Sequence, residues 1–280
     1  MPKLIFEVHE NFESARSRGL VVSLEKWLLR HPNHCVGIIR KGWSRGSWLE
    51  HMRNNPLFAE RVVLWHVRAT EYTKDTVTNL LKEVEQVKRL SPHVRFFVIK
   101  GDPDPADPMD GLDTLDALRV LKDLGFPTAA AIHPWPHDDG SEDCTALWQR
   151  TLRKIYLTDH LVTQVLFADP GYAYFWEDLA KHLSAMGLAR PSITLSLRLP
   201  QTLDDIVLMK TWGCWIPEEL EAELATLTLR DVSEVMAPHL RASHAFHKEH
   251  LQRQGFDLTG IYLSGSHQVL LSESLSGFCE

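Results

Sequence analysis

The feature that most constrains the fold is an alternation, repeated eight times along 280 residues, of short β-type runs and helical segments. The runs are rich in β-branched and aromatic residues, whereas the segments between them carry apolar residues at helical spacing. Strands are expected at residues 4–8, 35–39, 62–67, 96–99, 128–132, 161–167, 193–197 and 258–263. Eight strand-helix units predict an α/β protein, a single (β/α)8 TIM barrel over residues 1–280.

The segments between these runs predict the helices, several of which are closed by a Gly or Pro. They cover residues 14–29, 47–57, 73–90, 112–124, 142–157, 170–186, 203–210, 218–227 and 231–254, with a last helix from about Gln268. The alternative fold is a doubly wound open sheet, which has a Gly-rich first strand-helix turn. The turn here reads Val8-His9-Glu10-Asn11, so the barrel is favoured.

The net charge and the spacing of the cysteines indicate which partners and which cellular compartment to expect. The net charge is −7 and Lys and Arg form no block, so neither nucleic acid nor a membrane surface is expected as a partner. No apolar window is long enough for a transmembrane helix, and Met1-Pro2-Lys3 leads directly into a strand without a signal-peptide pattern. Four widely spaced Cys residues without a CxxC pair predict a cytoplasmic protein with no metal site.

Polar residues follow several of the predicted strands. The fourth strand stops abruptly at Lys100-Gly101-Asp102 and continues into a loop rich in Pro and Asp. In a barrel, the carboxyl ends of all strands meet at one mouth, where ligands bind. The residues expected there are Glu7, the Arg40-Lys41 loop, His66, Lys100, Gly101, Asp102, His133, His137, Thr163, Gln164 and Arg198. Acid, amide, imidazole and cation together suit a polar heteroaromatic ligand.

Several of these segments carry a family resemblance through their order and spacing. They are Ile5-Phe6-Glu7, Val98-Ile99-Lys100-Gly101-Asp102, Ala130-Ala131-Ile132-His133-Pro134 with His137, Leu152-Arg153-Lys154, the run from Asp159 to Phe167, and Leu199-Pro200 followed by Gly213 and Trp215-Ile216-Pro217. The chain resembles the catalytic barrel of the methylenetetrahydrofolate reductase family over nearly its whole length. The similarity is best from about Val94 to Pro217.

The resemblance implies an oxidoreductase of one-carbon metabolism. It implies a flavoprotein that uses FAD and a nicotinamide, NADH or NADPH, to interconvert 5,10-methylenetetrahydrofolate and 5-methyltetrahydrofolate. Glu7 matches the family's general acid, Asp102 the carboxylate that tunes the flavin, and Gln164 the amide that reads the pterin. The resemblance also implies further FAD contacts at His66, Lys100, Gly101, His133, His137, Arg153 and Lys154, and we expect substrate contacts at Met209 and Arg198.

The chain departs from the family mainly on the folate side, which leaves two alternatives. After the acid, the family carries aromatic residues and a Pro pair, where this chain has Val8-His9-Glu10-Asn11. His133 stands where the family usually has Tyr. The first alternative is a diverged barrel that binds folate or a partner protein without redox activity. The second is a flavin-dependent dehydrogenase of another small amine. A homo-oligomer or an accessory subunit is compatible with each hypothesis.

Overall fold

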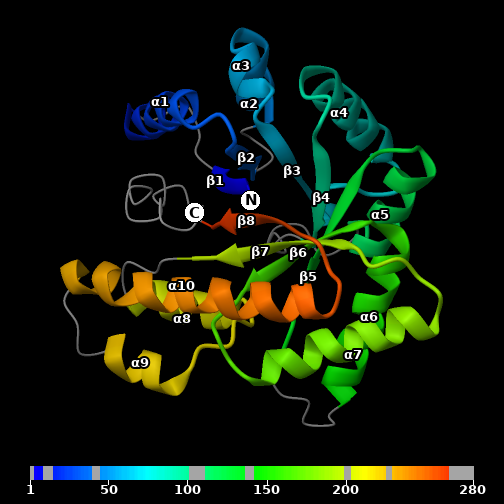
Figure 1. Cartoon of the computed structure of the whole chain (residues 1–280). Helices are drawn as coiled ribbons and strands as arrows, with labels where there is room; N and C mark the ends of the chain where they lie inside the picture. The colour runs from blue at the N-terminus through cyan, green and yellow to red at the C-terminus, as the bar shows by residue number, and fades with distance from the viewer. Residues whose placement is uncertain are drawn as a thin grey trace.

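The eight strands close into a parallel barrel in chain order, as the computed structural model shows (Figure 1). The structure describes residues 3–8, 15–39, 45–100, 111–135, 142–198, 203–224 and 229–264. Each strand pairs in parallel with the next, and β8 pairs with β1 to close the ring. The predicted (β/α)8 TIM barrel is therefore confirmed.

The strands lie within two residues of their predicted positions at each end. They are β1 (Lys3–Val8), β2 (Cys35–Ile38), β3 (Val62–Arg68), β4 (Arg95–Ile99), β5 (Thr128–Ile132), β6 (His160–Val165), β7 (Ser192–Leu197) and β8 (Leu258–Leu263). The helices are α1 (Ala15–Arg30), α2 (Arg45–Asn54), α3 (Pro56–Ala59), α4 (Val77–Leu90), α5 (Thr114–Asp123), α6 (Glu142–Leu157), α7 (Gly171–Ala185), α8 (Leu203–Thr211), α9 (Glu218–Leu224) and α10 (Leu229–Arg253), with a 3-10 turn η2 (Ala69–Glu71).

The strand alternation divides the apolar residues between two cores. Successive side chains of a strand point to opposite faces, so in β1 Leu4 and Phe6 face the helices while Ile5 and Glu7 face the barrel axis. The outer core fills the space between strands and helices. The smaller inner core consists of Ile5, Cys35, Leu64, Phe97, Ala129, Val162 and Tyr262. Tyr262 belongs to the inner core and brings a polar group into the barrel interior.

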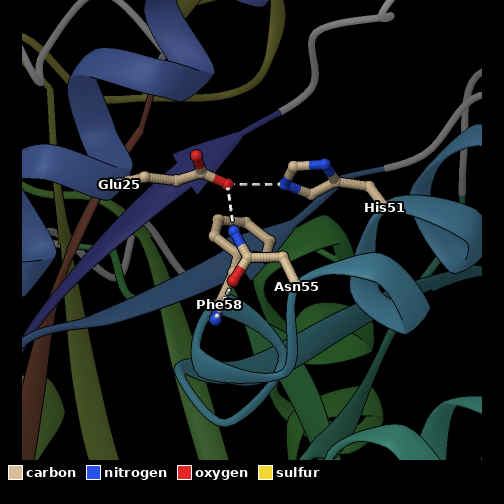
Figure 2. Close-up of polar contacts among 4 residues, drawn as sticks. All are labelled: Glu25, His51, Asn55 and Phe58. Atoms are coloured by element: carbon tan, nitrogen blue, oxygen red, sulfur yellow. Dashed lines mark hydrogen bonds and ion pairs between the residues drawn. The ribbon is translucent and has the colours of Figure 1, made fainter.

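The helix predicted over residues 47–57 is two helices, and this prediction was wrong. Asn55 interrupts it, because its side-chain oxygen accepts a hydrogen bond from the Phe58 N–H (3.1 Å) and Pro56 begins α3. Glu25 of α1 accepts hydrogen bonds from both His51 and Asn55 (Figure 2). Both bonds are 2.7 Å long. This polar cluster fixes α1 against α2 and α3.

Two other predicted boundaries shift. The helix predicted from Thr73 begins at Val77, because the Thr73 and Thr76 hydroxyls form a turn with each other's backbone N–H groups. The sixth strand ends at Val165 rather than Phe167. The helix expected from Gln268 lies outside the described residues. Within the described ranges, every helix is too short or too polar to cross a bilayer.

Candidate functional site

The candidate site is the barrel mouth at the carboxyl ends of the strands, where the side chains of several predicted residues lie inside the ring. Glu7, His66, Gln164 and Arg198 come from β1, β3, β6 and the residue after β7. The predicted residues Gly101, Asp102 and His137 and the Arg40-Lys41 loop lie outside the described residues. The described part of the mouth therefore consists of strand ends and the helices that pack against them.

A buried hydrogen-bonded chain of three side chains crosses the barrel interior. Tyr262 of β8 is hydrogen-bonded to Glu7 of β1, and its hydroxyl lies 2.7 Å from Nε2 of His66 on β3. Glu7, His66 and Tyr262 are 7%, 2% and 3% exposed, respectively. A carboxylate, a phenol and an imidazole thus form one polar array in a largely apolar interior, which is where such groups need hydrogen-bond partners.

The glycine of β2 provides the room for this chain. A Cβ added to Gly37 would lie 2.7 Å from Cε2 of Tyr262, too close for any side chain. The Tyr262 ring therefore passes over β2 at the one position without a side chain and reaches His66 on the next strand. Phe97 supports the far end, because its ring meets the His66 imidazole edge to face at 4.6 Å.

The protonation state of Tyr262 follows from its environment. Burial, then the charge of Glu7 and the hydrogen bond to it, raise the pKa of Tyr262 well above its ordinary value of 10.0. Tyr262 therefore remains a phenol, and its hydroxyl is hydrogen-bonded to Glu7 and to Nε2 of His66. The array thus keeps a phenolic proton next to Glu7.

Three residues predicted to bind substrate converge on one turn after α8. The Gln164 side chain donates to the Trp212 carbonyl (2.9 Å) and accepts from the Val165 N–H (3.0 Å). Arg198 is paired with Asp205 (2.8 Å), and its guanidinium lies over the Trp212 ring at 5.2 Å. The Trp212 N–H donates to the carbonyl of Met209 (3.1 Å), whose side chain is fully buried in the outer core.

This cluster holds α8 against the ends of β6 and β7. The Gln164 amide and one terminal nitrogen of Arg198 are bonded to the protein, whereas the buried Nε of Arg198 has no hydrogen-bond partner among the described residues. Burial favours a packing role for Met209. The predicted substrate contacts at Gln164, Arg198 and Met209 stay predictions. Asp205 and Trp212 had no signal in the sequence, because the contact depends on how α8 folds back.

A second polar group joins β5 to α6. Lys154 is buried, and its ammonium donates to the carbonyl of Ala131 (2.6 Å). Burial and then the charge of Arg150 lower the pKa of Lys154 to about 8, although Asp113 opposes this. Burial, followed by Lys154 and Arg150, lowers the pKa of His133 to about 4. His133 is therefore neutral at pH 7 and available as a hydrogen-bonding imidazole at the rim.

The described residues fit FAD poorly. His66 is enclosed and bonded to Tyr262, and Lys154 is bonded to a strand carbonyl. Its neighbour Arg153 is exposed on α6, so the predicted phosphate contacts point in different directions. Lys100 is exposed at the end of β4, and its carbonyl accepts from Thr70. The described cations therefore do not converge on one place that would hold the FAD phosphates.

Tyr262 is the functional candidate that our sequence predictions missed. The alternation of β8 alone places Tyr262 on the inward face, one residue before the end of the strand. That signal is weak, because inward positions near the ends of barrel strands also take packing residues.

No family model matches the chain, and no curated protein matches it. The resemblance to the methylenetetrahydrofolate reductase family therefore stays a prediction. Among solved structures, an uncharacterized protein from Clostridium thermocellum that binds two copies of 5-methyl-5,6,7,8-tetrahydrofolic acid is similar, with a TM-score of 0.67 and 14% identity. The match covers 98% of this chain and 93% of that chain.

Two dihydropteroate synthases match with lower scores. The enzyme from Stenotrophomonas maltophilia has a TM-score of 0.45 and 13% identity, covering 99% of this chain and 92% of that chain. The enzyme from Xanthomonas albilineans has a TM-score of 0.43 and 12% identity, covering 99% and 93%. At these identities the likeness is one of fold. Fold and site together define a (β/α)8 barrel with a buried carboxylate-phenol-imidazole array at its carboxyl-end mouth.

Proposed function

We propose that the barrel binds a reduced folate, such as 5-methyltetrahydrofolate, at its carboxyl-end mouth. The observation that carries the proposal is the buried array of Glu7, Tyr262 and His66 inside that mouth. The pterin of a tetrahydrofolate joins a flat pyrimidine ring to a puckered saturated ring, and the pyrimidine edge carries N–H donors and acceptors. A carboxylate that accepts and a neutral imidazole at the rim, such as His133, suit that edge. The fold likeness to a protein that binds 5-methyltetrahydrofolic acid supports the same class of ligand.

The second candidate is the reductase that the sequence resemblance implies. It would interconvert 5,10-methylenetetrahydrofolate and 5-methyltetrahydrofolate with FAD and with NADH or NADPH as hydride donor. The observation that favours it is Glu7, which lies at the carboxyl end of β1 in contact with a phenol that retains its proton. A carboxyl group in that position can exchange a proton with a bound folate, as a general acid requires. The poor fit of the described residues to FAD ranks this candidate second.

Calorimetric titration with 5-methyltetrahydrofolate tests the first candidate. We expect saturable binding by the purified protein, and binding at least about tenfold weaker in Glu7→Gln, because the variant loses a charged acceptor. A protein that shows no saturable heat with the folate contradicts the proposal.

A visible spectrum recorded after incubation with FAD separates the two candidates. Folate binding by a protein that retains no flavin supports the first candidate. A flavin spectrum that NADH or NADPH bleaches, and that 5,10-methylenetetrahydrofolate then restores, supports the reductase. In that case Glu7→Gln is expected to preserve bleaching by the nicotinamide and to abolish turnover of the folate.

A further inference from the structure

A large cavity opens at the opposite end of the barrel, where the strands begin. Its volume is about 960 Å³, and its wall includes Lys3, Arg95 and His160, the first residues of β1, β4 and β6. The last turn of α4 contributes Lys88, and α10 contributes Lys248. Ligand pockets in proteins typically span about 300–1,000 Å³, so the space suits a molecule of nucleotide size.

The charge of this cavity is opposite to that of the whole chain. Lys3, Lys88, Arg95 and Lys248 line it, and Asp257 is the one acidic side chain among the described lining residues. The chain as a whole has a net charge of −7. Cations gathered in a concave site raise the local concentration of anions, because low-dielectric walls focus the field.

These cations lack acidic partners among the described residues. The Lys88 ammonium donates to the carbonyl of Pro92 (2.5 Å), which leaves its charge uncompensated. The Arg95 Nε is buried and has no hydrogen-bond partner in the described structure. A buried guanidinium nitrogen without a partner is costly, and Arg presents a planar fork that matches carboxylate and phosphate oxygens. The excess of cations over acidic side chains around this cavity therefore favours an anionic ligand.

His160 forms a neutral polar wall beside Arg95. Its ring nitrogens lie 2.6 Å from the Ser192 hydroxyl and 3.0 Å from the Thr194 hydroxyl. Burial, followed by the charge of Arg95, lowers the pKa of His160 to about 3. The His160 imidazole therefore adds no positive charge to the cavity at pH 7.

We propose that this amino-end cavity binds a small organic anion with at least two negative charges, carried by phosphate or carboxylate groups. The cations on β1, β4, α4 and α10 surround the charged end of the ligand. Apolar side chains of the same cavity, Ile5, Leu64 and Phe256, contact its carbon skeleton. The ligand would connect elements far apart in the sequence, so its binding stabilises the closed barrel. The site is separate from the carboxyl-end mouth and does not depend on the function proposed there.

Thermal unfolding and calorimetry of the full-length protein test the proposal. The probes are pyrophosphate for phosphate groups and citrate for carboxylate groups, with sodium chloride at matched ionic strength as the control. We expect at least one probe to raise the unfolding temperature saturably, beyond the effect of chloride. A response to pyrophosphate alone identifies a phosphate site, and a response to citrate alone identifies a carboxylate site. Equal responses identify a site that recognises negative charge without selecting the chemical group.

Matched variants locate the binding. Lys248→Gln and Arg95→Gln are each expected to lower the affinity for the probe by about tenfold or more, because a charge-assisted hydrogen bond is lost. Lys82→Gln changes the same residue type on α4 outside the cavity and is expected to bind as the wild type does. Lys248 lies near the surface, so its variant remains informative if Arg95→Gln unfolds. No saturable response to either probe, or equal affinity in Lys248→Gln and wild type, would overturn the proposal.

Discussion

The cationic side chains at the two mouths of the barrel differ in whether they have acidic partners. At the carboxyl end, Arg198 is paired with Asp205 and the Lys154 ammonium is bonded to the Ala131 carbonyl. At the amino end, Lys3, Lys88, Arg95 and Lys248 line a cavity with no acidic partner among the described residues. A buried cation at the carboxyl end therefore has an acidic partner, whereas the four cations at the amino end have none among the described residues.

This difference separates two kinds of site. A cation that is already paired with a carboxylate, such as Arg198 with Asp205, is compensated in the protein without ligand. Uncompensated cations repel one another, so their stability depends on what binds. The comparison predicts that mutations at the carboxyl end destabilise the barrel, whereas loss of charge at the amino end has little effect until an anion is added.

The largest expected effect is acid destabilisation, to which both mouths contribute. The pKa values of His133 at the carboxyl end and His160 at the amino end are lowered to about 4 and about 3, and that of His247 in the outer core to about 4, each mainly by burial. The unfolded chain binds protons at these residues below about pH 6.5, while the native state does so only near its lowered pKa values. The free energy of unfolding therefore falls with pH below about 6.5, by up to about 3 kcal/mol per histidine at pH 4.5.

Urea unfolding between pH 7.5 and 4.5 checks this prediction. His160→Gln and His133→Gln each remove one titrating group, so the slope with pH is expected to be smaller in both variants. A free energy of unfolding that is constant over this pH range contradicts the assignment of neutral buried histidines.

The next effect contrasts two arginines. Arg198→Met removes the partner of Asp205 in a pair whose side chains are 9% and 18% exposed, so we expect a loss of about 3 kcal/mol in unfolding free energy. Arg95→Met removes a cation without an acidic partner, so the expected change is within about 0.5 kcal/mol or stabilising. Chemical denaturation of both variants measures the contrast. Equal losses in the two variants would remove the distinction between the mouths.

A smaller effect concerns the buried array. Tyr262→Phe removes a hydroxyl that bonds both Glu7 and His66, and the expected loss is about 1–3 kcal/mol, because two buried polar groups lose a partner. Tyr174→Phe is the matched control, since Tyr174 is 71% exposed on α7, and no change is expected. Denaturant midpoints of both variants provide the measurement. A Tyr262→Phe variant as stable as wild type would show that the array contributes no stability.

The smallest effect provides a baseline away from both mouths. Asn55→Ala removes the cap of α3 and one hydrogen bond to Glu25 (Figure 2), at an expected cost of about 1 kcal/mol. Calorimetry is expected to give unchanged affinity for ligands at either end. Altered affinity in this variant would mean that a loss of stability alone weakens binding. The affinities of the variants at both mouths would then have to be corrected for their loss of stability.

The sequence predicts the fold well because the strand positions are encoded locally. Each strand is a short apolar run bounded by turn residues, and the repeated unit allows few topologies. The carboxyl-end positions of Glu7 and His66 follow from the same pattern. The sequence does not predict that Tyr262 connects these two residues, because this contact depends on the closure of β8 against β1 and on the space above Gly37.

The amino-end cavity is also invisible in the sequence. Lys3, Lys88, Arg95 and Lys248 come from four separate elements, and no local spacing relates them. Only the closed barrel brings them around one space. Barrel ligands generally bind at the carboxyl ends of the strands, so the sequence predicts a site at that end and none at the amino end.

The most direct test of the central proposal is the affinity for 5-methyltetrahydrofolate in wild type, Tyr262→Phe and Lys248→Gln, measured by calorimetry in one buffer. We predict saturable binding in wild type, affinity at least about tenfold weaker in Tyr262→Phe, and unchanged affinity in Lys248→Gln. Absence of binding in wild type, or equal affinity in wild type and Tyr262→Phe, would contradict a folate site built on the Glu7, Tyr262 and His66 array.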